Sequence, residues 1–150
     1  MLKYTTLCYI EQDGKYLMLY RNKRKEDVNA GKWIGIGGHL EEGETPEECL
    51  VREALEETGL KLKDFKLRGK LHFHMDDIFE ISYLYTCNSF EGELIECNEG
   101  ELQWISKNQI LDLPLWKGDY LFLNKLLEEE DFFEMKLVYK NDELIEWSIL

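Results

Sequence analysis

The chain has 150 residues, of which 44% are hydrophobic and 13% aromatic, a composition typical of a globular rather than a disordered protein. Its formal net charge of −13 disfavours nucleic acid as a partner, because that binding needs clustered Lys and Arg. We expect neither a signal peptide nor a membrane anchor, since no apolar run approaches the roughly 20 residues of a membrane span. The four cysteines are scattered without metal-ligand spacing, which predicts reduced thiols in a cytoplasmic protein.

The first part of the chain predicts short strands. Residues 4–10 alternate in a strand-like way and residues 16–20 read YLMLY, so the turn signal between them predicts a hairpin. Residues 21–32 form a charged loop. The stretch 33–38 (WIGIGG) predicts a return to a short strand that ends in glycines, with Trp33 packed beneath the glycine turn.

A helix with both ends marked comes next. Thr45 suits the N-cap and Pro46 the first helical position. Glu48 stands three residues after the cap and completes a capping box, and Gly59 supplies the left-handed residue that ends a helix. An apolar stripe is expected to face the core; its members are Leu50, Val51, Ala54 and Leu55.

Three carboxylates gather on another face of this helix. Glu53, Glu56 and Glu57 stand at i, i+3 and i+4, and like charges at that spacing destabilise a helix. A divalent cation would make the cluster favourable instead, and carboxylate oxygens suit Mg²⁺, Mn²⁺ or Ca²⁺. The alternative is a solvated acidic face in which Arg52 pairs with Glu56 at i,i+4.

The second part of the chain predicts further strands, a second long helix and a closing hairpin. Extended segments are expected at 60–67, 70–75, 79–87 and 101–105, with 90–96 as a loop or edge strand. A short helix is expected at 106–111, a longer one at 119–127, and the hairpin at 135–139 and 144–149. These elements predict an α+β, or mixed α/β, fold with a mixed sheet and two main helices, formed by residues 1–150 as a single domain.

The stretch 38–60 resembles the Nudix box, Gly-x5-Glu-x7-Arg-Glu-U-x-Glu-Glu-x-Gly-U, where U is a bulky aliphatic residue. The fixed positions are occupied by Gly38, Glu44, Arg52, Glu53, Glu56, Glu57, Gly59 and Leu60, with Ala54 as a soft match at the first aliphatic position. The chain is therefore identified as a member of the Nudix hydrolase family. The resemblance, and not the periodicity, implies an αβα sandwich.

The likeness continues beyond the box toward MutT-type and MutX-like members. It rests on Trp33 before the glycines, Glu99 before Trp104, Trp116 with Asp119, and the C-terminal hairpin. Such enzymes use Mg²⁺ to hydrolyse oxidised purine nucleoside triphosphates, such as 8-oxo-dGTP, to the monophosphate and pyrophosphate. The resemblance implies this reaction here, as part of nucleotide-pool sanitising and DNA repair.

The same resemblance implies roles for the acidic residues. The metal site is expected to comprise Glu53, Glu56, Glu57 and Glu99, together with a carbonyl group of Gly37 or Gly38. Arg52 would orient the carboxylates and Glu44 would hold the loop. For the general base, Glu56 or Glu57 ranks first and Glu99 second; the alternative for Glu99 is a surface position in a polar loop.

The substrate-binding candidates are less strongly implied. Arg21 and Lys23 stand where family members often contact phosphate or nucleotide, and His39 replaces a usual lysine and either contacts phosphate or caps its loop. Trp116 offers a stacking face for the base and Asp119 a carboxylate for its edge.

Three further side chains have simpler interpretations. His72 and His74 share one face of an expected strand and are candidates for the base pocket. Trp147 is expected to pack in the core or the hairpin.

The chain also resembles the animal oxidised-purine triphosphatases, but it departs from them at the residues that contact the base. Ile34 stands where they carry Asn, and Gly118-Asp119 stands where they carry two aspartates. Other substrates therefore stay open: undamaged dNTPs, ADP-ribose, a dinucleoside polyphosphate or an RNA 5′ end. A non-catalytic nucleotide-binding regulator is the alternative from another class, and either a monomer or a homodimer is compatible with the sequence.

Overall fold

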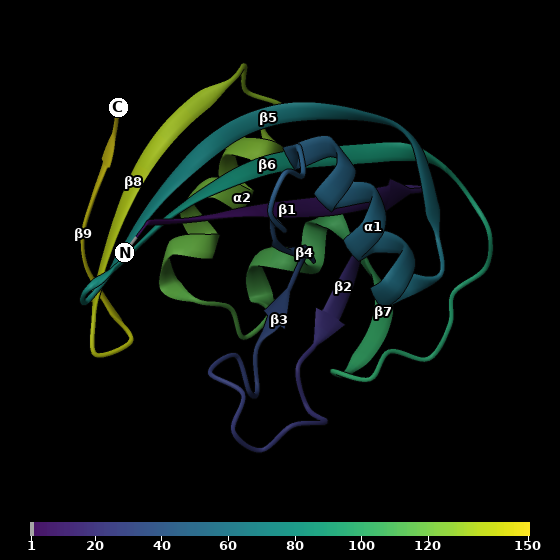
Figure 1. The fold of residues 1–150 in the computed structure, drawn as a ribbon, viewed down its shortest axis with the longest axis horizontal. Helices are drawn as coiled ribbons and strands as arrows, with labels where there is room; N and C mark the ends of the chain where they lie inside the picture. The colour runs from purple at the N-terminus through teal and green to yellow at the C-terminus, as the bar shows by residue number, and fades with distance from the viewer. Residues whose placement is uncertain (1) are drawn as a thin grey trace.

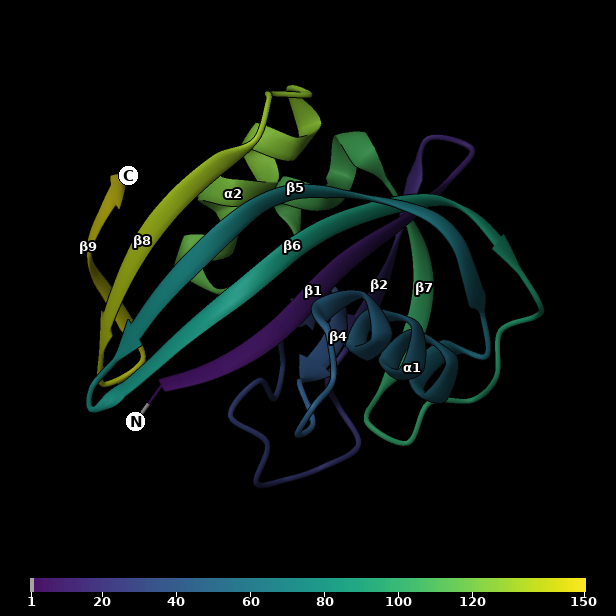
Figure 2. The same cartoon turned by 45° about the horizontal axis from the view of Figure 1, so that its top comes forward.

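The computed structural model describes residues 2–150, in which a mixed sheet lies between two main helices (Figures 1 and 2). The strands are β1 (Leu2–Gln12), β2 (Lys15–Tyr20), β3 (Trp33–Ile34), β4 (Ile36–His39), β5 (Lys61–Met75), β6 (Ile78–Glu91), β7 (Glu101–Ser106), β8 (Phe133–Lys140) and β9 (Glu143–Ile149). The helices are α1 (Pro46–Thr58), α2 (Lys117–Leu127) and the short 3₁₀ helix η1 (Lys107–Asp112). This arrangement confirms the predicted fold class.

The strand order is β3-β2-β1-β6-β5-β8-β9, with β4 also paired to β1 and β7 to β2. The predicted β1–β2 hairpin forms only at its tip, where Glu11 pairs with Tyr16 and Gln12 with Lys15. Upstream of the tip, β1 pairs in parallel with β6 and antiparallel with β4. Since both edges of β1 are then occupied, β2 diverges and pairs with β3 and β7.

Two sequence predictions about strand boundaries are wrong. The segments predicted at 60–67 and 70–75 form one continuous strand, β5, whose bulges against β6 absorb the break in alternation. The single strand predicted at 33–38 is divided at Gly35 into β3 and β4. A Cβ at Gly35 would lie 2.9 Å from the Cys8 carbonyl oxygen, so the close approach to β1 requires glycine there.

Two apolar clusters fill the opposite faces of the sheet. The cluster beneath α2 contains Tyr9, Leu71, Leu84, Phe122 and Met135 among others. The cluster beneath α1 contains Cys8, Ile10, Leu50, Ala54 and Tyr85 among others. Neighbouring residues of β1 therefore face opposite clusters, as strand alternation requires. All four cysteines are buried and free, and no helix in residues 2–150 has the length and apolarity needed to cross a bilayer.

The predicted ends of α1 are confirmed. The Thr45 hydroxyl accepts a hydrogen bond from the Glu48 amide at 3.1 Å, and the Glu48 carboxylate accepts one from the Thr45 amide at 2.9 Å. Gly59 ends the helix in the left-handed conformation. One member of the predicted apolar stripe is misassigned, because Leu55 is 49% exposed whereas Leu50 and Ala54 are buried.

The apolar stripe of α1 can be tested by truncating one leucine on each side of its boundary. Leu50→Ala is expected to lower the free energy of unfolding by about 2–5 kcal/mol, because it opens a cavity in the core. Leu55→Ala should change it by less than about 1 kcal/mol, because its side chain is half exposed. Urea unfolding measures both, and equal losses would contradict the orientation of α1.

Candidate active site

The acidic side of α1 faces the glycines of β4 at very short range. The Gly37 amide donates a hydrogen bond to Glu57 Oε2 at 3.1 Å. A Cβ at Gly38 would lie 2.5 Å from Glu53 Cδ, and a Cβ at Gly37 would lie 1.9 Å from the Thr6 carbonyl oxygen. Glycine is therefore required at both positions for the carboxylates of α1 to approach the strand.

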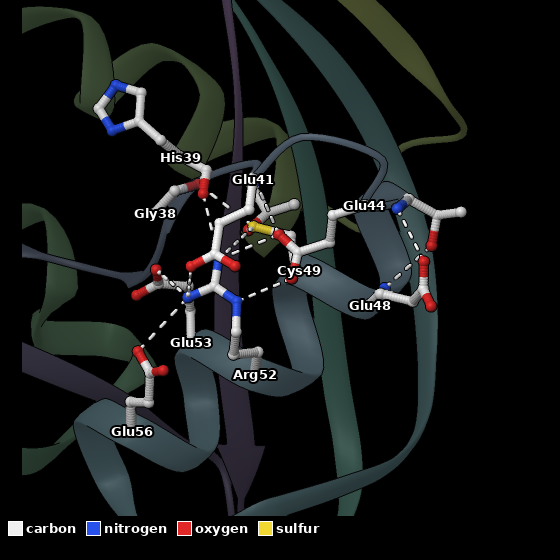
Figure 3. A network of polar contacts seen from close by, with 11 residues as sticks. Gly38, His39, Glu41, Glu44, Glu48, Cys49, Arg52, Glu53 and Glu56 are labelled. Carbon is white, nitrogen blue, oxygen red and sulfur yellow. Dashed lines mark hydrogen bonds and ion pairs between the residues drawn. The ribbon is translucent and has the colours of Figure 1, made fainter.

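Arg52 connects this acidic cluster to the loop before α1 (Figure 3). Its guanidinium donates two hydrogen bonds to Glu44, at 2.7 and 3.0 Å, and one to Glu53 at 2.9 Å. It also reaches Glu56 at 3.4 Å and the His39 carbonyl oxygen at 3.2 Å. The hydrogen bond from Arg52 lowers the pKa of Glu44 to about 2, so that carboxylate is a fixed anion. The contacts of Arg52 therefore extend beyond the i,i+4 ion pair with Glu56 that the sequence offered as an alternative.

The carboxylates of Glu53, Glu57 and Glu99 are close enough to repel one another. Burial raises the pKa of Glu57 to about 9, and the charges of Glu53 and Glu99 add to the increase. Burial also raises the pKa of Glu53, although Arg52 acts in the opposite direction. Glu56 differs from the other two helix glutamates because its side chain is 60% exposed, with Oε2 lying 3.4 Å from Arg52 Nη1.

The chemistry of this donor set fits a hard divalent cation. Carboxylates that repel one another are stabilised when a divalent cation lies between them. Within residues 2–150, however, no three acidic, histidine or cysteine side chains are close enough together to bind an ion by themselves. Mg²⁺ commonly shares a few carboxylates with substrate phosphates, so the incomplete set agrees with a site that the nucleotide completes.

The two predicted basic contacts are held by acidic partners. Arg21 Nε lies 2.6 Å from Asp27, and its Nη1 lies 3.4 Å from Glu99, which brings Arg21 to the carboxylate cluster. Lys23 instead donates to the Cys97 carbonyl oxygen at 2.7 Å and lies 3.4 Å from Glu96. Arg21 is therefore the better positioned of the two for a role in the site.

Trp116 and Asp119 lie together at the start of α2. The Trp116 indole donates to Asn29 at 2.7 Å, contacts the Tyr139 ring edge-to-face at 5.8 Å, and has Lys32 Nζ 4.6 Å from its ring centroid. Asp119 is buried, and that burial raises its pKa to about 8 although the Lys32 charge opposes the shift. A neutral carboxyl can donate a hydrogen bond as well as accept one.

The space beside Gly118 is occupied by Tyr139. The Gly118 amide donates to the Tyr139 hydroxyl at 2.7 Å, and a Cβ at Gly118 would lie 2.5 Å from that oxygen. The sequence comparison identified the absent carboxylate, but the tyrosine beside Gly118 is remote in sequence.

His72 and His74 share one face of β5, as predicted, but it is not the face that carries Trp116 and Asp119. Their neighbours Leu71, Phe73 and Met75 belong to the α2-side cluster, so strand alternation directs both histidines to the opposite face. There His72 lies 2.9 Å from Glu134, and the His74 ring contacts Phe79.

Two further side chains lie near the site. Trp147 lies in the β8–β9 hairpin opposite Leu137, which is one of the two predicted positions, and its half-exposed side chain lines a cavity of about 650 Å³ beside Trp116. His39 Nε2 lies 3.3 Å from Glu80, a residue that the sequence reasoning did not single out. Strand alternation from Leu84 would have directed Glu80 toward the α2 side.

Comparison with known proteins identifies the family. The model of the NUDIX domain matches residues 1–126. The oxidized purine nucleoside triphosphate hydrolase of Danio rerio is 30% identical over 149 residues, which cover 98% of this chain and 94% of that protein. The uncharacterized Nudix hydrolase YvcI of Bacillus subtilis is 29% identical, covering 92% and 87%. The crystal structure of a MutT protein from Bacillus halodurans has a TM-score of 0.88 at 27% identity, covering 98% and 97%.

The raised pKa of Asp119 predicts a pH dependence of stability. Because the folded pKa is about 8 and an unfolded aspartate titrates near about 3.9, ionisation of Asp119 opposes folding as pH rises between these values. Asp119→Asn should therefore be more stable than wild type at pH 8, with little difference at pH 4. Urea unfolding across this range measures the effect. The exposed substitution Asp131→Asn is the control, and parallel curves for wild type and Asp119→Asn would refute the burial of an ionisable carboxyl.

Proposed function

The chain belongs to the Nudix hydrolase family, and we propose that it is an Mg²⁺-dependent hydrolase that converts oxidised purine nucleoside triphosphates, such as 8-oxo-dGTP, to the monophosphate and pyrophosphate. The observation that carries the proposal is the carboxylate cluster of Glu53, Glu57 and Glu99 against the glycines of β4. The Danio rerio relative, 94% of which aligns with this chain, is named an oxidized purine nucleoside triphosphate hydrolase, and this name supports the choice of substrate.

The reaction needs a cation near the phosphates and a base for the attacking water. We assign the cation to Glu53, Glu57 and Glu99 with a carbonyl group of Gly37 or Gly38, and Mn²⁺ as an alternative to Mg²⁺. When bound, the cation neutralises the negative charge of the phosphates and of the carboxylates themselves. Without it, a chain with a net charge of −13 repels an anionic substrate.

We assign the role of general base to Glu56, which would accept the proton of the attacking water. It is open to solvent, while Glu57 is engaged by the Gly37 amide and Glu53 by Arg52. Glu57 and then Glu99 are the alternatives for this role. Arg52 positions the carboxylates and couples them to Glu44, so that the loop and the helix hold one geometry.

Base recognition is assigned to the other end of the site. Trp116 supplies an aromatic face and Asp119 a carboxyl that is neutral at pH 7, so it can donate to a carbonyl oxygen or ring nitrogen of the base. Arg21 is assigned to the phosphate side, whereas His39 lies on the α2 side of β4 against Glu80, so the predicted phosphate contact of His39 is not retained. A small-molecule nucleotide is thus the proposed partner, in a cytoplasmic enzyme that sanitises the nucleotide pool as a single domain.

The substrate is tested by pyrophosphate release with Mg²⁺ from dGTP, 8-oxo-dGTP, 2-oxo-dATP, dATP and ADP-ribose, ranked by kcat/KM. We expect an oxidised purine to lead, because the site offers a stacking face and a neutral carboxyl for its edge. A flat ranking, or one led by ADP-ribose, would contradict the sanitising role. Absence of turnover with both Mg²⁺ and Mn²⁺ would contradict the hydrolase itself and favour a nucleotide-binding regulator.

The general base is tested in the same assay. Glu56→Gln should lower kcat by about 10²–10⁴-fold, as expected for loss of a general base, with an unchanged melting temperature. If Glu57→Gln or Glu99→Gln, but not Glu56→Gln, produced that loss, the assignment would pass to the other residue.

The metal site is tested through Gly38. A Cβ at this position would displace the Glu53 carboxylate, so Gly38→Ala should weaken Mg²⁺ binding by about tenfold or more, measured by isothermal titration calorimetry. Glu42→Gln is the control, because Glu42 is an exposed acid in the neighbouring loop. Equal affinities for the two variants would argue against Glu53 as a ligand.

A further inference from the structure

His39 contacts a carboxylate that lies on the opposite side of β4 from the acidic cluster. Its Nε2 lies 3.3 Å from Glu80 Oε1, and its ring points away from the Arg52 network in Figure 3. The His39 side chain is 62% exposed, whereas that of Glu80 is only 18% exposed. Glu80 is therefore the more enclosed partner, and a carboxylate at that depth needs hydrogen-bond donors.

Strand register defines the surroundings of Glu80. Glu80 on β6 stands opposite Phe73 on β5, and Phe73 packs against the α2-side cluster. Thr5 on β1 stands opposite both Ser82 on β6 and His39 on β4. Directly paired residues share a face of a sheet. Glu80, Ser82, Thr5 and His39 therefore form a polar strip on the same face as α2.

Aromatic rings connect this polar strip to Trp116. Trp116 contacts Tyr139 with ring centroids 5.8 Å apart, and Tyr139 and Phe73 have centroids 6.5 Å apart. Phe73 in turn stands opposite Glu80. One face of the sheet thus carries a row of aromatic rings with Trp116 at one end and an enclosed carboxylate at the other, a combination suited to a planar heterocycle with a polar edge.

The strip also adjoins the carboxylate cluster. In β4 the Cβ direction of Gly38 points to Glu53, so the neighbouring His39 points to the other face. Among the strands of residues 2–150, β4 pairs only with β1, which leaves its other edge unpaired. A nucleotide whose phosphates lie at the carboxylates can pass around this edge and bring its base onto the α2-side face.

We propose that Glu80 is a specificity-determining residue that accepts a hydrogen bond from an exocyclic amino group of the purine. An ionised carboxylate only accepts hydrogen bonds, so it favours a base edge that donates and disfavours one that offers a carbonyl oxygen or a C–H group. This inference rests on the proposed function. It adds to that function a preference for purines that carry an amino group.

The test compares two substrate pairs that each differ only by an amino group. In the first pair, dGTP carries the 2-amino group that dITP lacks. In the second, dATP carries the 6-amino group that the triphosphate of purine 2′-deoxyriboside lacks. Wild type should prefer the amino-bearing member of one pair by about tenfold or more in kcat/KM, since a base without that amino group displaces water from the partly enclosed carboxylate without supplying a hydrogen-bond donor in return. The pair that shows the preference identifies which amino group Glu80 contacts.

Glu80→Ala should reduce that preference to within about twofold, by lowering kcat/KM mainly for the amino-bearing nucleotide. Glu80→Gln, which conserves shape, should reduce it less. The matched control is Glu134→Ala, because Glu134 forms the equivalent contact with His72, at 2.9 Å, on the opposite face of the sheet. Melting temperatures show whether each variant is folded.

Three results would overturn the inference while leaving the hydrolase intact. These are a wild-type ratio near one for both pairs, an unchanged ratio in folded Glu80→Ala or Glu80→Gln, and the same loss of preference in Glu134→Ala. Failure of wild type to hydrolyse any of the four triphosphates would contradict the proposed function itself.

Discussion

Repulsion between carboxylates held in one place is the constraint on which the rest of this site depends. Burial raises the pKa of Glu57 to about 9, and the nearby charges of Glu53 and Glu99 add to the increase, in a chain whose net charge is already −13. Only one cationic side chain, Arg52, contacts Glu53 within residues 2–150, and it is shared with Glu44 and Glu56. Arg21 Nη1 lies 3.4 Å from Glu99, so the two guanidinium groups together leave the cluster only partly neutralised. That property favours a cation and, through it, an anionic substrate.

Steric exclusion at β4 allows the cluster to form. The carboxylate of Glu53 occupies the space that a side chain at position 38 would need, and the Thr6 carbonyl oxygen occupies the space beside Gly37. The same short strand separates the carboxylates on its α1 side from His39 on its α2 side. A strand of four residues thus lies between the carboxylates that we propose for phosphate chemistry and the face that we propose for base recognition.

On the α2 side, burial rather than charge pairing controls the polar groups. Asp119 has its pKa raised to about 8 by burial, and the Tyr9 hydroxyl, also in this cluster, is buried without a hydrogen-bond partner in residues 2–150. Tyr139 takes the volume next to Gly118, and its hydroxyl accepts a hydrogen bond from the Gly118 amide. A buried polar group without a hydrogen-bond partner destabilises the folded protein. Local destabilisation of this kind is typical of sites that bind a ligand.

The sequence alone determined the local features of this protein. The capping box, the helix end at Gly59 and the spacing of Glu53, Glu56 and Glu57 depend on residues within four positions of each other, so a helix of known period specifies them. Because the Nudix box is one continuous stretch of sequence, it could be recognised without the structure, and the family and fold class were predicted correctly. Leu55 was misassigned because helical period defines an apolar stripe without showing where its buried edge lies.

Tertiary structure decided whatever depends on strand pairing and on contacts between remote segments. The long β5 strand, the divergence of β2 and the face occupied by His72 and His74 follow from register, which the linear pattern does not encode. The contact of His39 with Glu80, 41 positions along the chain, and of Gly118 with Tyr139, 21 positions along, exists only because separate strands and helices pack together. The physical reason is that short-range propensity selects a helix or a strand, whereas the enclosure, charge and partners of a side chain are set by the elements that pack against it.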